Sequence, residues 1–392
     1  MTMAVAGSDT LYAHAFCPIA PIGMTSWRSQ SIVTHIMLWA AKGGGGGFGA
    51  APKGKNKQKA PPRKAATAQS VQKKLQKAYG GASTPQEIAQ ATQKRVEAAM
   101  QDLPPHLQMA TSLYQQLQKW NTQYERLSIL QQANLPQAEL DGAERAKKEL
   151  ERLCKEHDIH EMDLHNLFQK ITWDASADAK AARSLTGKMP AEIARKIDRA
   201  CELAAETVTS VEGGRCLDVG CGYGVLVPHL KAAGLTNKQI VGVDLSPEMI
   251  RNAEELYPSI SFHAADFVQE FDSGVDKGTS GSEGGEGEGY NVIMFCSALH
   301  DMPDIHATLL KAAKLLRANG TLIVLHAQGA SHVLKQVSAN PVLVKRGLPD
   351  EQELIELLKP QGLELEVAPA PAGSPADTEQ GYLAVLRKTG SA

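Results

Sequence analysis

The sequence predicts an α/β protein with a mostly parallel, doubly wound sheet, preceded by a helical hairpin or small bundle and a disordered amino terminus. A buried strand, a glycine-rich turn and a helix follow one another over residues 217–234. Apolar side chains at helical spacing run through residues 84–153. We therefore expect a disordered basic segment at 1–80, a helical region at 84–170 and an α/β domain at 171–392.

The amino-terminal segment, residues 1–80, is basic and poor in acids. It holds eleven Lys and Arg side chains and one acidic residue, Asp9, and residues 43–66 consist mainly of Gly, Pro, Lys and Ala. Its composition resembles an organelle transit peptide, with a plastid slightly ahead of a mitochondrion as the destination. The alternatives are a cytoplasmic protein and a basic arm that touches nucleic acid, although we do not expect nucleic acid as a partner.

Helix signals mark the region that follows. Thr84-Pro85-Gln86-Glu87 forms a capping box with proline at the first helical position, and Pro104-Pro105 ends that helix. Pro136 then separates two apolar stripes, Ala110, Leu113, Leu117, Trp120, Tyr124 and Leu127, and Leu140, Ala143, Leu150 and Leu153. We expect an antiparallel hairpin or small bundle with solvated polar faces, and a surface for a protein partner as the alternative.

The glycine-rich turn, LDVGCGYG at 217–224, says most about function. Its glycines are Gly220, Gly222 and Gly224. Glycine is required where φ is positive or where backbone touches a ligand. The dinucleotide pattern needs a further glycine where Val225 stands, and no Gly-Lys-Ser/Thr follows, so NAD and P-loop sites are excluded. Asp218 would repel a phosphate but suits a cationic amino-acid end.

This turn and four later segments resemble the class I S-adenosylmethionine (SAM)-dependent methyltransferases, over residues 172–388. The segments are IVGVDLS at 240–246, ISFHAADF at 260–267, NVIMFCSALHDMPD at 291–304 and LLRANGTLIVLH at 315–326. The resemblance implies seven strands in the order 3-2-1-4-5-7-6. The last strand, near Gly381–Leu386, would be antiparallel.

The resemblance also implies SAM as the cofactor, held by Asp218, Gly220, Gly222, Gly224, Asp244, Asp266 and Phe267. In this family Asp244 would accept hydrogen bonds from the ribose hydroxyls, Asp266 from the adenine amino group, and Phe267 would support the ring. The segment before the glycine-rich turn often covers the cofactor, so Trp173 and Asp174 are candidates for a lid. A core tryptophan and a helix-capping aspartate are the alternatives.

The class of molecule that accepts the methyl group is narrowed mainly by excluding known acceptor types. The segment FCSALHD lacks the Asn-Pro-Pro-Tyr of amino-methylating enzymes, and Cys296 lacks the proline of cytosine-C5 enzymes. His300 is the candidate general base, with His326 as a second candidate and packing as the alternative for both. The leading function is methyl transfer to a small organic acceptor by in-line displacement. The alternatives are a protein or RNA methyltransferase and an inactive SAM-binding assembly factor.

Two further segments belong to this domain. Residues 272–289, rich in Gly, Ser and Glu, should form a solvated loop. In the family that the chain resembles, a connection such as residues 327–347 commonly walls the acceptor pocket. Lys335, Lys345 and Arg346 are then candidates to face an anionic acceptor, and a solvated basic loop is the favoured alternative. The six cysteines form no C-x-x-C motif, so no metal site is expected. No apolar run reaches the length of about 18 residues that a membrane span needs.

Overall fold

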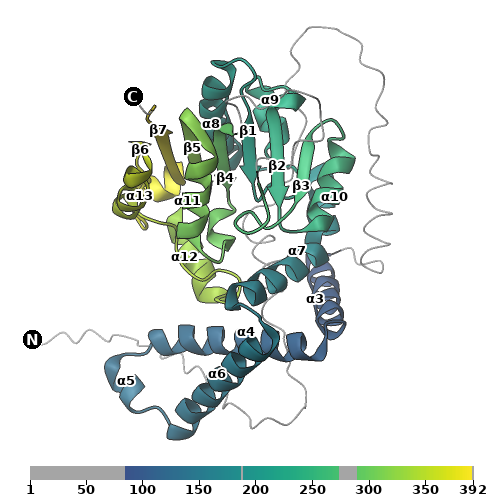
Figure 1. The fold of residues 1–392 in the computed structure, drawn as a ribbon, viewed down its shortest axis with the longest axis vertical. Coiled ribbons are helices and arrows are strands. Elements are labelled where there is room, and N and C mark those ends of the chain that lie inside the picture. The colour runs from purple at the N-terminus through teal and green to yellow at the C-terminus, as the bar shows by residue number, and fades with distance from the viewer. Residues whose placement is uncertain (1–83, 187–188, 273–288, 391–392) are drawn as a thin grey trace, which may run out of the picture.

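The computed structural model describes residues 84–186, 189–272 and 289–390 (Figure 1). The basic segment 1–80 and almost all of the 272–289 insertion lie outside the described residues. The described chain folds into one sheet with helices on both faces and a helical region beside its carboxyl edge. The strands are β1 (Cys216–Val219), β2 (Ile240–Asp244), β3 (Ser261–Ala264), β4 (Tyr290–Cys296), β5 (Leu316–His326), β6 (Leu363–Val367) and β7 (Tyr382–Lys388).

The strand order is β3-β2-β1-β4-β5-β7-β6, which confirms the predicted sheet. The first five strands of this order run parallel, and β7 pairs antiparallel with both β5 and β6. From β1 the chain moves outward first to β2 and β3, and then crosses back to β4 on the other side. Ligands of open α/β sheets bind at the carboxyl ends of the strands where the order reverses in this way. The candidate site is therefore expected beside the ends of β1, β2 and β4.

Each face of the sheet has its own apolar core. Leu217, Val241 and Ile293 point to the face covered by α11 (Ile305–Leu315) and α13 (Glu351–Leu358). The neighbouring positions in the strands point to the opposite face, which is covered by α8 (Ala191–Thr209), α9 (Val227–Ala232) and α10 (Pro247–Leu256). Strands that are buried on both faces read as continuous apolar runs, which is why these segments were recognisable in the sequence.

The helical region contains α3 (Pro85–Gln101), α4 (Pro105–Glu125), α5 (Ile129–Ala133) and α6 (Gln137–His157). The predicted capping box at Thr84 and Glu87 is present at the start of α3. The short helix α5, before Pro136, was not expected. Burial in α4 also differs from the predicted stripe, because Tyr114 is fully buried whereas Trp120 and Tyr124 stack on each other at 4.9 Å near the surface.

Helix α7 (Glu161–Thr186) joins this region to the sheet. Its 26 residues run through the boundary expected between 170 and 171 without a break. On one side, the Tyr114 hydroxyl and Nδ1 of His165 lie 3.0 Å apart and link α4 to α7. On the other side, the amide of Gln169 donates to the carbonyls of Asp301 and Leu343. In Figure 1, α7 lies between the helical region and the carboxyl edge of the sheet.

Asp174 fixes α7 to the start of α10. Its Oδ1 accepts hydrogen bonds from the Ser246 hydroxyl at 2.5 Å and the Glu248 N–H at 3.3 Å. The same hydroxyl accepts from the Met249 N–H and caps α10. Asp174 therefore sits in mid-helix and supports the cap of a different helix, rather than capping its own.

The long connection after β5 contains α12 (Ala330–Ala339), and α14 (Pro375–Gln380) precedes β7. Asp377 of α14 accepts hydrogen bonds from the Ala330 and Ser331 N–H groups, which begin α12. Val342, Leu343 and Val344 then pack into the core of the helical region. In the described part of the chain, no helix combines the length and apolar character needed to cross a membrane.

We expect Asp174→Ala to lower the free energy of unfolding by about 1–3 kcal/mol, because the Ser246 hydroxyl and the Glu248 N–H lose their acceptor. Chemical denaturation measures the change. Asp141→Ala is the matched control, since this exposed aspartate accepts, among the described residues, only from Gln137 on its own helix, and its loss should cost under about 0.5 kcal/mol. Equal effects of the two substitutions would contradict the capping role of Asp174.

Candidate functional site

The three glycines of the turn after β1 all have positive φ, from +55° to +83°. A Cβ on Gly220 would lie 2.4 Å from the Cβ of Ala298, and one on Gly224 would lie 2.9 Å from the Tyr257 ring. These two positions therefore need glycine for packing as well as for conformation. A Cβ on Gly222 would meet no described atom within 4 Å, so its backbone faces open space that a ligand can occupy.

Asp244 closes this turn from the end of β2. Its Oδ2 accepts the Gly222 N–H and its Oδ1 accepts the Ser246 N–H, both at 2.9 Å. The carboxylate is half-buried, and burial raises its pKa against the opposing effect of the two N–H donors. Each carboxylate oxygen has two lone pairs, so both keep one acceptor position for a ligand. The sequence had placed Asp244 at the site but gave no sign of its structural part in the turn.

Acidic side chains gather at this edge of the sheet. Asp218 is 3% exposed, and burial together with the charge of Asp244 raises its pKa to about 8. Burial also raises the pKa of Asp301, against the positive fields of His300 and Lys180. The ionised forms of Asp218, Asp244 and Asp301 are thus disfavoured in the protein alone, so the site favours a ligand that brings positive charge.

Helix α7 supplies the opposite wall. Trp173 stands between Gln169, which reaches the loop after β4, and Asp174, which reaches the start of α10. The Nζ of Lys180 lies 3.9 Å from the centroid of the Trp173 ring. Sequence reasoning pointed to Trp173 but missed Lys180, because a lysine on a helix carries no local signal of what it faces.

Asp266 and Phe267, the residues expected at the adenine, follow β3 and make several contacts within the protein. The Oδ1 of Asp266 accepts the N–H groups of Val268 and Gln269, and its Oδ2 accepts from the amide of Asn166 on α7. Much of its hydrogen-bonding capacity is thus used within the protein. Phe267 is 4% exposed and packs against Phe271 and Phe295, so its ring belongs to the core rather than offering a free face to an adenine.

His300 lies in the short 3-10 helix Leu299–Asp301 after β4. Its Nε2 is 3.6 Å from Oδ1 of Asp301, and its Nδ1 is buried without a hydrogen-bond partner among the described residues. The ring is 5% exposed and meets the His326 ring edge-on at 5.0 Å. Both candidate bases are therefore neighbours at the ends of β4 and β5.

A third imidazole, His332 of α12, stacks on His326 at 5.6 Å. Sequence reasoning missed it, since α12 could not be placed beside β5 from spacing alone. Burial lowers the pKa of His326, and it lowers that of His332 to about 4, with His300 adding to both shifts. Even so, the described residues contain no group of three His, Cys, Asp or Glu side chains arranged to hold a metal ion.

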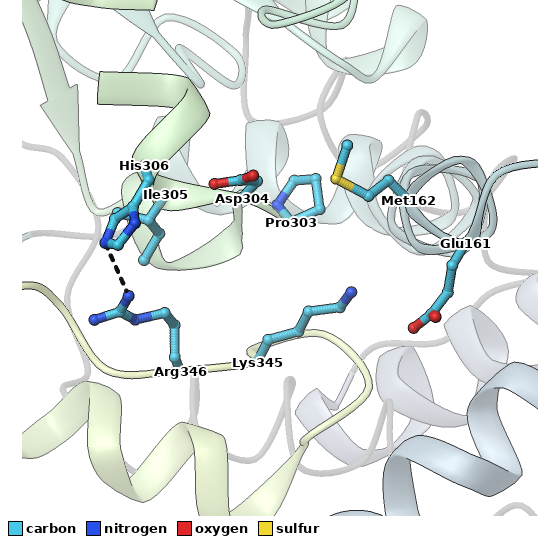
Figure 2. Close-up of a pocket in the computed structure, with 8 residues that line it drawn as sticks. All are labelled: Glu161, Met162, Pro303, Asp304, Ile305, His306, Lys345 and Arg346. Atoms are coloured by element: carbon cyan, nitrogen blue, oxygen red, sulfur yellow. Dashed lines mark hydrogen bonds between the residues drawn. The ribbon is translucent and has the colours of Figure 1, made fainter. Parts of the chain in front are cut away.

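A pocket of about 310 Å³ opens beside the loop after β4 (Figure 2). It is lined by Glu161, Met162, Pro303, Asp304, Ile305, His306, Lys345 and Arg346. Lys345 and Arg346 line this pocket, whereas Lys335 is exposed on α12 and does not line it. Burial lowers the pKa of Lys345, against the fields of Glu161 and Asp304.

Arg346 is already paired within the protein. It contacts Glu353 at 2.6 Å, and Glu353 also contacts His306 at 2.5 Å. The Asp350 side chain caps α13 by accepting the Glu353 N–H. Glu353 thus engages both Arg346 and His306. Of the basic side chains that line the pocket, Lys345 is therefore the one best placed to meet a ligand.

Comparison with known proteins agrees with this geometry. Residues 185–367 match the family model described as a methyltransferase domain. The chain is similar to the ubiquinone biosynthesis O-methyltransferase of Rhodopseudomonas palustris, with 28% identity over 157 residues, or 39% of this chain and 56% of that protein. The enzyme of the same name from Thiobacillus denitrificans is 26% identical over 202 residues, or 47% of this chain and 82% of that protein. The chain therefore spans little more than half the length of the first relative.

Among solved structures, magnesium protoporphyrin IX methyltransferase from Synechocystis, with bound S-adenosylhomocysteine (SAH), is 15% identical with a TM-score of 0.40. The match covers 58% of this chain and all of that one.

The raised pKa of Asp218 makes the ligand-free protein sensitive to pH. An aspartate with a pKa near 4 when unfolded and about 8 when folded binds its proton more tightly in the folded state. Its contribution to stability is thus complete below pH 4 and is lost as the pH rises towards 8, by at most about 1.4 kcal/mol per pH unit.

We expect Asp218→Asn, which cannot ionise, to flatten the fall in stability between pH 5 and pH 8. Chemical denaturation of both proteins at several pH values measures this, and the difference between them removes the contribution of the other titrating groups. If the free energy of unfolding falls equally with pH in both proteins, the pKa of Asp218 is not raised by folding.

Proposed function

We infer that this protein transfers a methyl group from SAM to a small organic acceptor, using the α/β domain of which residues 185–367 match a methyltransferase domain. One observation carries the proposal: the open space at Gly222 adjoins the carboxylate of Asp244, whose charge acts on the buried carboxyl of Asp218. The SAM molecule supplies an activated methyl on a positively charged sulfur. A site with backbone access and strained carboxyls fits a ligand of that charge.

In this proposal the protein binds the cofactor through backbone at Gly222 and through two carboxylates. Asp244 offers its two remaining acceptor positions to the ribose hydroxyls, and Asp218 faces the amino-acid end. Asp266 retains an acceptor position on Oδ2 for the adenine amino group. Phe267 supports this part of the site from within the core.

We propose an oxygen atom as the methyl acceptor, with His300 as the general base. Asp301 beside Nε2 favours the tautomer that carries its proton there, which leaves the Nδ1 lone pair to take a proton from a hydroxyl. Release of that proton lets the oxygen attack the methyl carbon in line with the breaking carbon–sulfur bond. The names of the O-methyltransferase relatives support an oxygen acceptor.

Orientation should supply most of the rate acceleration, of the order of 7–11 kcal/mol in favourable cases. The loop after β4 and the pocket beside it are the elements that would orient the acceptor. Lys345 suits an acceptor that carries an acidic group, because its ammonium lies in that pocket while Arg346 is already paired.

The competing function is methylation of a protein or an RNA, docked on the helical region. Incubating the full chain with methyl-labelled SAM and a cell extract separates the two. Label in a small molecule other than SAM, absent when the protein is left out, supports the proposal, and transfer of label to macromolecules alone overturns it.

We expect calorimetry on the full chain to detect binding of SAM but not of NAD. Asp244→Ala should weaken SAM binding by about 2–4 kcal/mol, since two hydrogen bonds to a charged acceptor are lost. It should also lower the free energy of unfolding by about 1–2 kcal/mol, because the Gly222 and Ser246 N–H groups lose their acceptor. Unchanged SAM affinity would remove Asp244 from the cofactor site.

We expect His300→Gln to lower turnover about 10²-fold or more and leave SAM affinity unchanged, since general bases contribute roughly 10²–10⁴-fold. The loss should shrink as the pH rises, because the acceptor hydroxyl then ionises without help. Steady-state kinetics from pH 6 to pH 10 test this, with the exposed His160→Gln as control. A small, pH-independent loss would make His300 a packing residue.

A further inference from the structure

The two most exposed large apolar side chains of the described residues are neighbours at one end of the molecule. Ile129 is 85% exposed and Leu130 is 76% exposed, whereas the next in order, Met109, is 52% exposed. Both belong to the short helix α5, which joins α4 to α6 and has no buried residue. In Figure 1, α5 lies at the end of the α4–α6 hairpin that is remote from the sheet. These two side chains therefore add nothing to the core that the hairpin shares with α7.

The tip of the hairpin, residues 127–138, carries no charge. It contains no Asp, Glu, Lys, Arg or His, and the nearest charged residues along the chain are Arg126 and Glu139. Its polar side chains are neutral amides and one hydroxyl. Desolvation of an ion is the most costly step when a protein surface leaves water, and this tip avoids it.

The polar side chains of the tip bind its own backbone. The Ser128 hydroxyl accepts the Gln131 N–H, and the Gln131 side chain accepts the Ser128 N–H at 2.9 Å. The Gln132 amide donates to the carbonyls of Tyr124 and Leu127, where α4 ends. These bonds satisfy backbone groups that the helix ends would otherwise leave to water. Unsatisfied backbone groups are the main obstacle to placing a turn in lipid, so the bonds lower this barrier.

An aromatic pair lies behind the tip on α4. Trp120 and Tyr124 are half-buried and stack on each other at 4.9 Å. At 1.5 Å per residue, both stand within about 8 Å of the end of α4 at Glu125. Trp and Tyr are enriched at the boundary between lipid and water, because each joins an apolar ring to a polar group. The hairpin thus presents aliphatic side chains first and aromatic ones behind them.

The apolar surface of the tip is too small to hold a protein partner firmly. A specific interface buries about 800 Å² on each partner and involves about 20–30 residues of each. The tip offers two exposed aliphatic side chains on a helix of five residues. A lipid layer needs no matching pocket, and the strength of its contact scales with whatever apolar area is buried.

We propose that residues 127–138 enter the surface layer of a phospholipid bilayer, with Ile129 and Leu130 among the acyl chains and the Trp120–Tyr124 pair at the headgroups. The contact is weak and reversible, because two aliphatic side chains bury less apolar area than a single fatty-acyl anchor. It depends on apolar burial and not on charge, since the tip has none. It is also independent of the cofactor and of the methyl acceptor.

The test is co-sedimentation of the full chain with vesicles of phosphatidylcholine at increasing lipid concentration. This neutral lipid removes any contribution from the basic side chains of residues 1–80. We expect binding of the wild type that added salt does not weaken. Ile129→Ser combined with Leu130→Ser should lower the partition into lipid at least about 10-fold, the factor that burial of one aliphatic side chain already supplies.

The matched control is Leu334→Ser combined with Ile355→Ser, which removes two exposed aliphatic side chains from α12 and α13. It should bind vesicles as the wild type does. Failure of the wild type to bind phosphatidylcholine vesicles would overturn the proposal, as would equal binding by the tip variant. Binding that requires phosphatidylserine and is lost at high salt would reassign the contact to basic side chains.

Sedimentation equilibrium without lipid separates a bilayer from a second copy of the chain. We expect the wild type and the tip variant, Ile129→Ser with Leu130→Ser, to have the same oligomeric state. A dimer that the tip variant converts to a monomer would instead assign the tip to an interface between copies. Circular dichroism should show the same helix content in both proteins, because the two substituted side chains lie outside the core.

Discussion

The hydrogen bonds of Asp244 organise the rest of the site. One carboxylate oxygen holds the glycine turn after β1 through Gly222, and the other holds the start of α10 through Ser246. Ser246 in turn donates to Asp174, which brings α7 over the edge of the sheet. A half-buried carboxylate is costly unless its lone pairs are used, so these two hydrogen bonds stabilise Asp244 in the turn and still leave acceptor positions for a ligand.

The sequence predicted the sheet and the glycine turn because both depend on local chemistry. Buried parallel strands appear as short apolar runs, and positive φ or close packing selects glycine at Gly220 and Gly224. The antiparallel last strand and the strand order came from the family resemblance, and the structure confirms them. The position of Asp218 beside the turn also follows from this local pattern, whereas that of Asp244 came from the family resemblance.

The contacts that complete the site were not predictable, because they join residues far apart in the chain. The bonds of α7 to the sheet side, through Asn166, Gln169 and Asp174, span from 72 to 174 residues. No spacing rule reports such contacts. Phe267 differs, because the family resemblance identified the residue correctly by position, but contacts with distant residues such as Phe295 bury its ring in the core. Likewise, the pairing of Arg346 with Glu353 decides which cation of the pocket is left for a ligand.

Helix α7 has a consequence for where the smallest independently folding unit begins. The domain match starts at residue 185, yet Asp174 and Lys180 lie before it. The first half of the same helix shares a core with α4 through Tyr114 and Phe168. A chain cut at the start of the matched domain would lose the bond of α7 to the start of α10, and one cut within α7 would expose apolar side chains of the core shared with α4. The helical region and the candidate site thus share one continuous helix, α7.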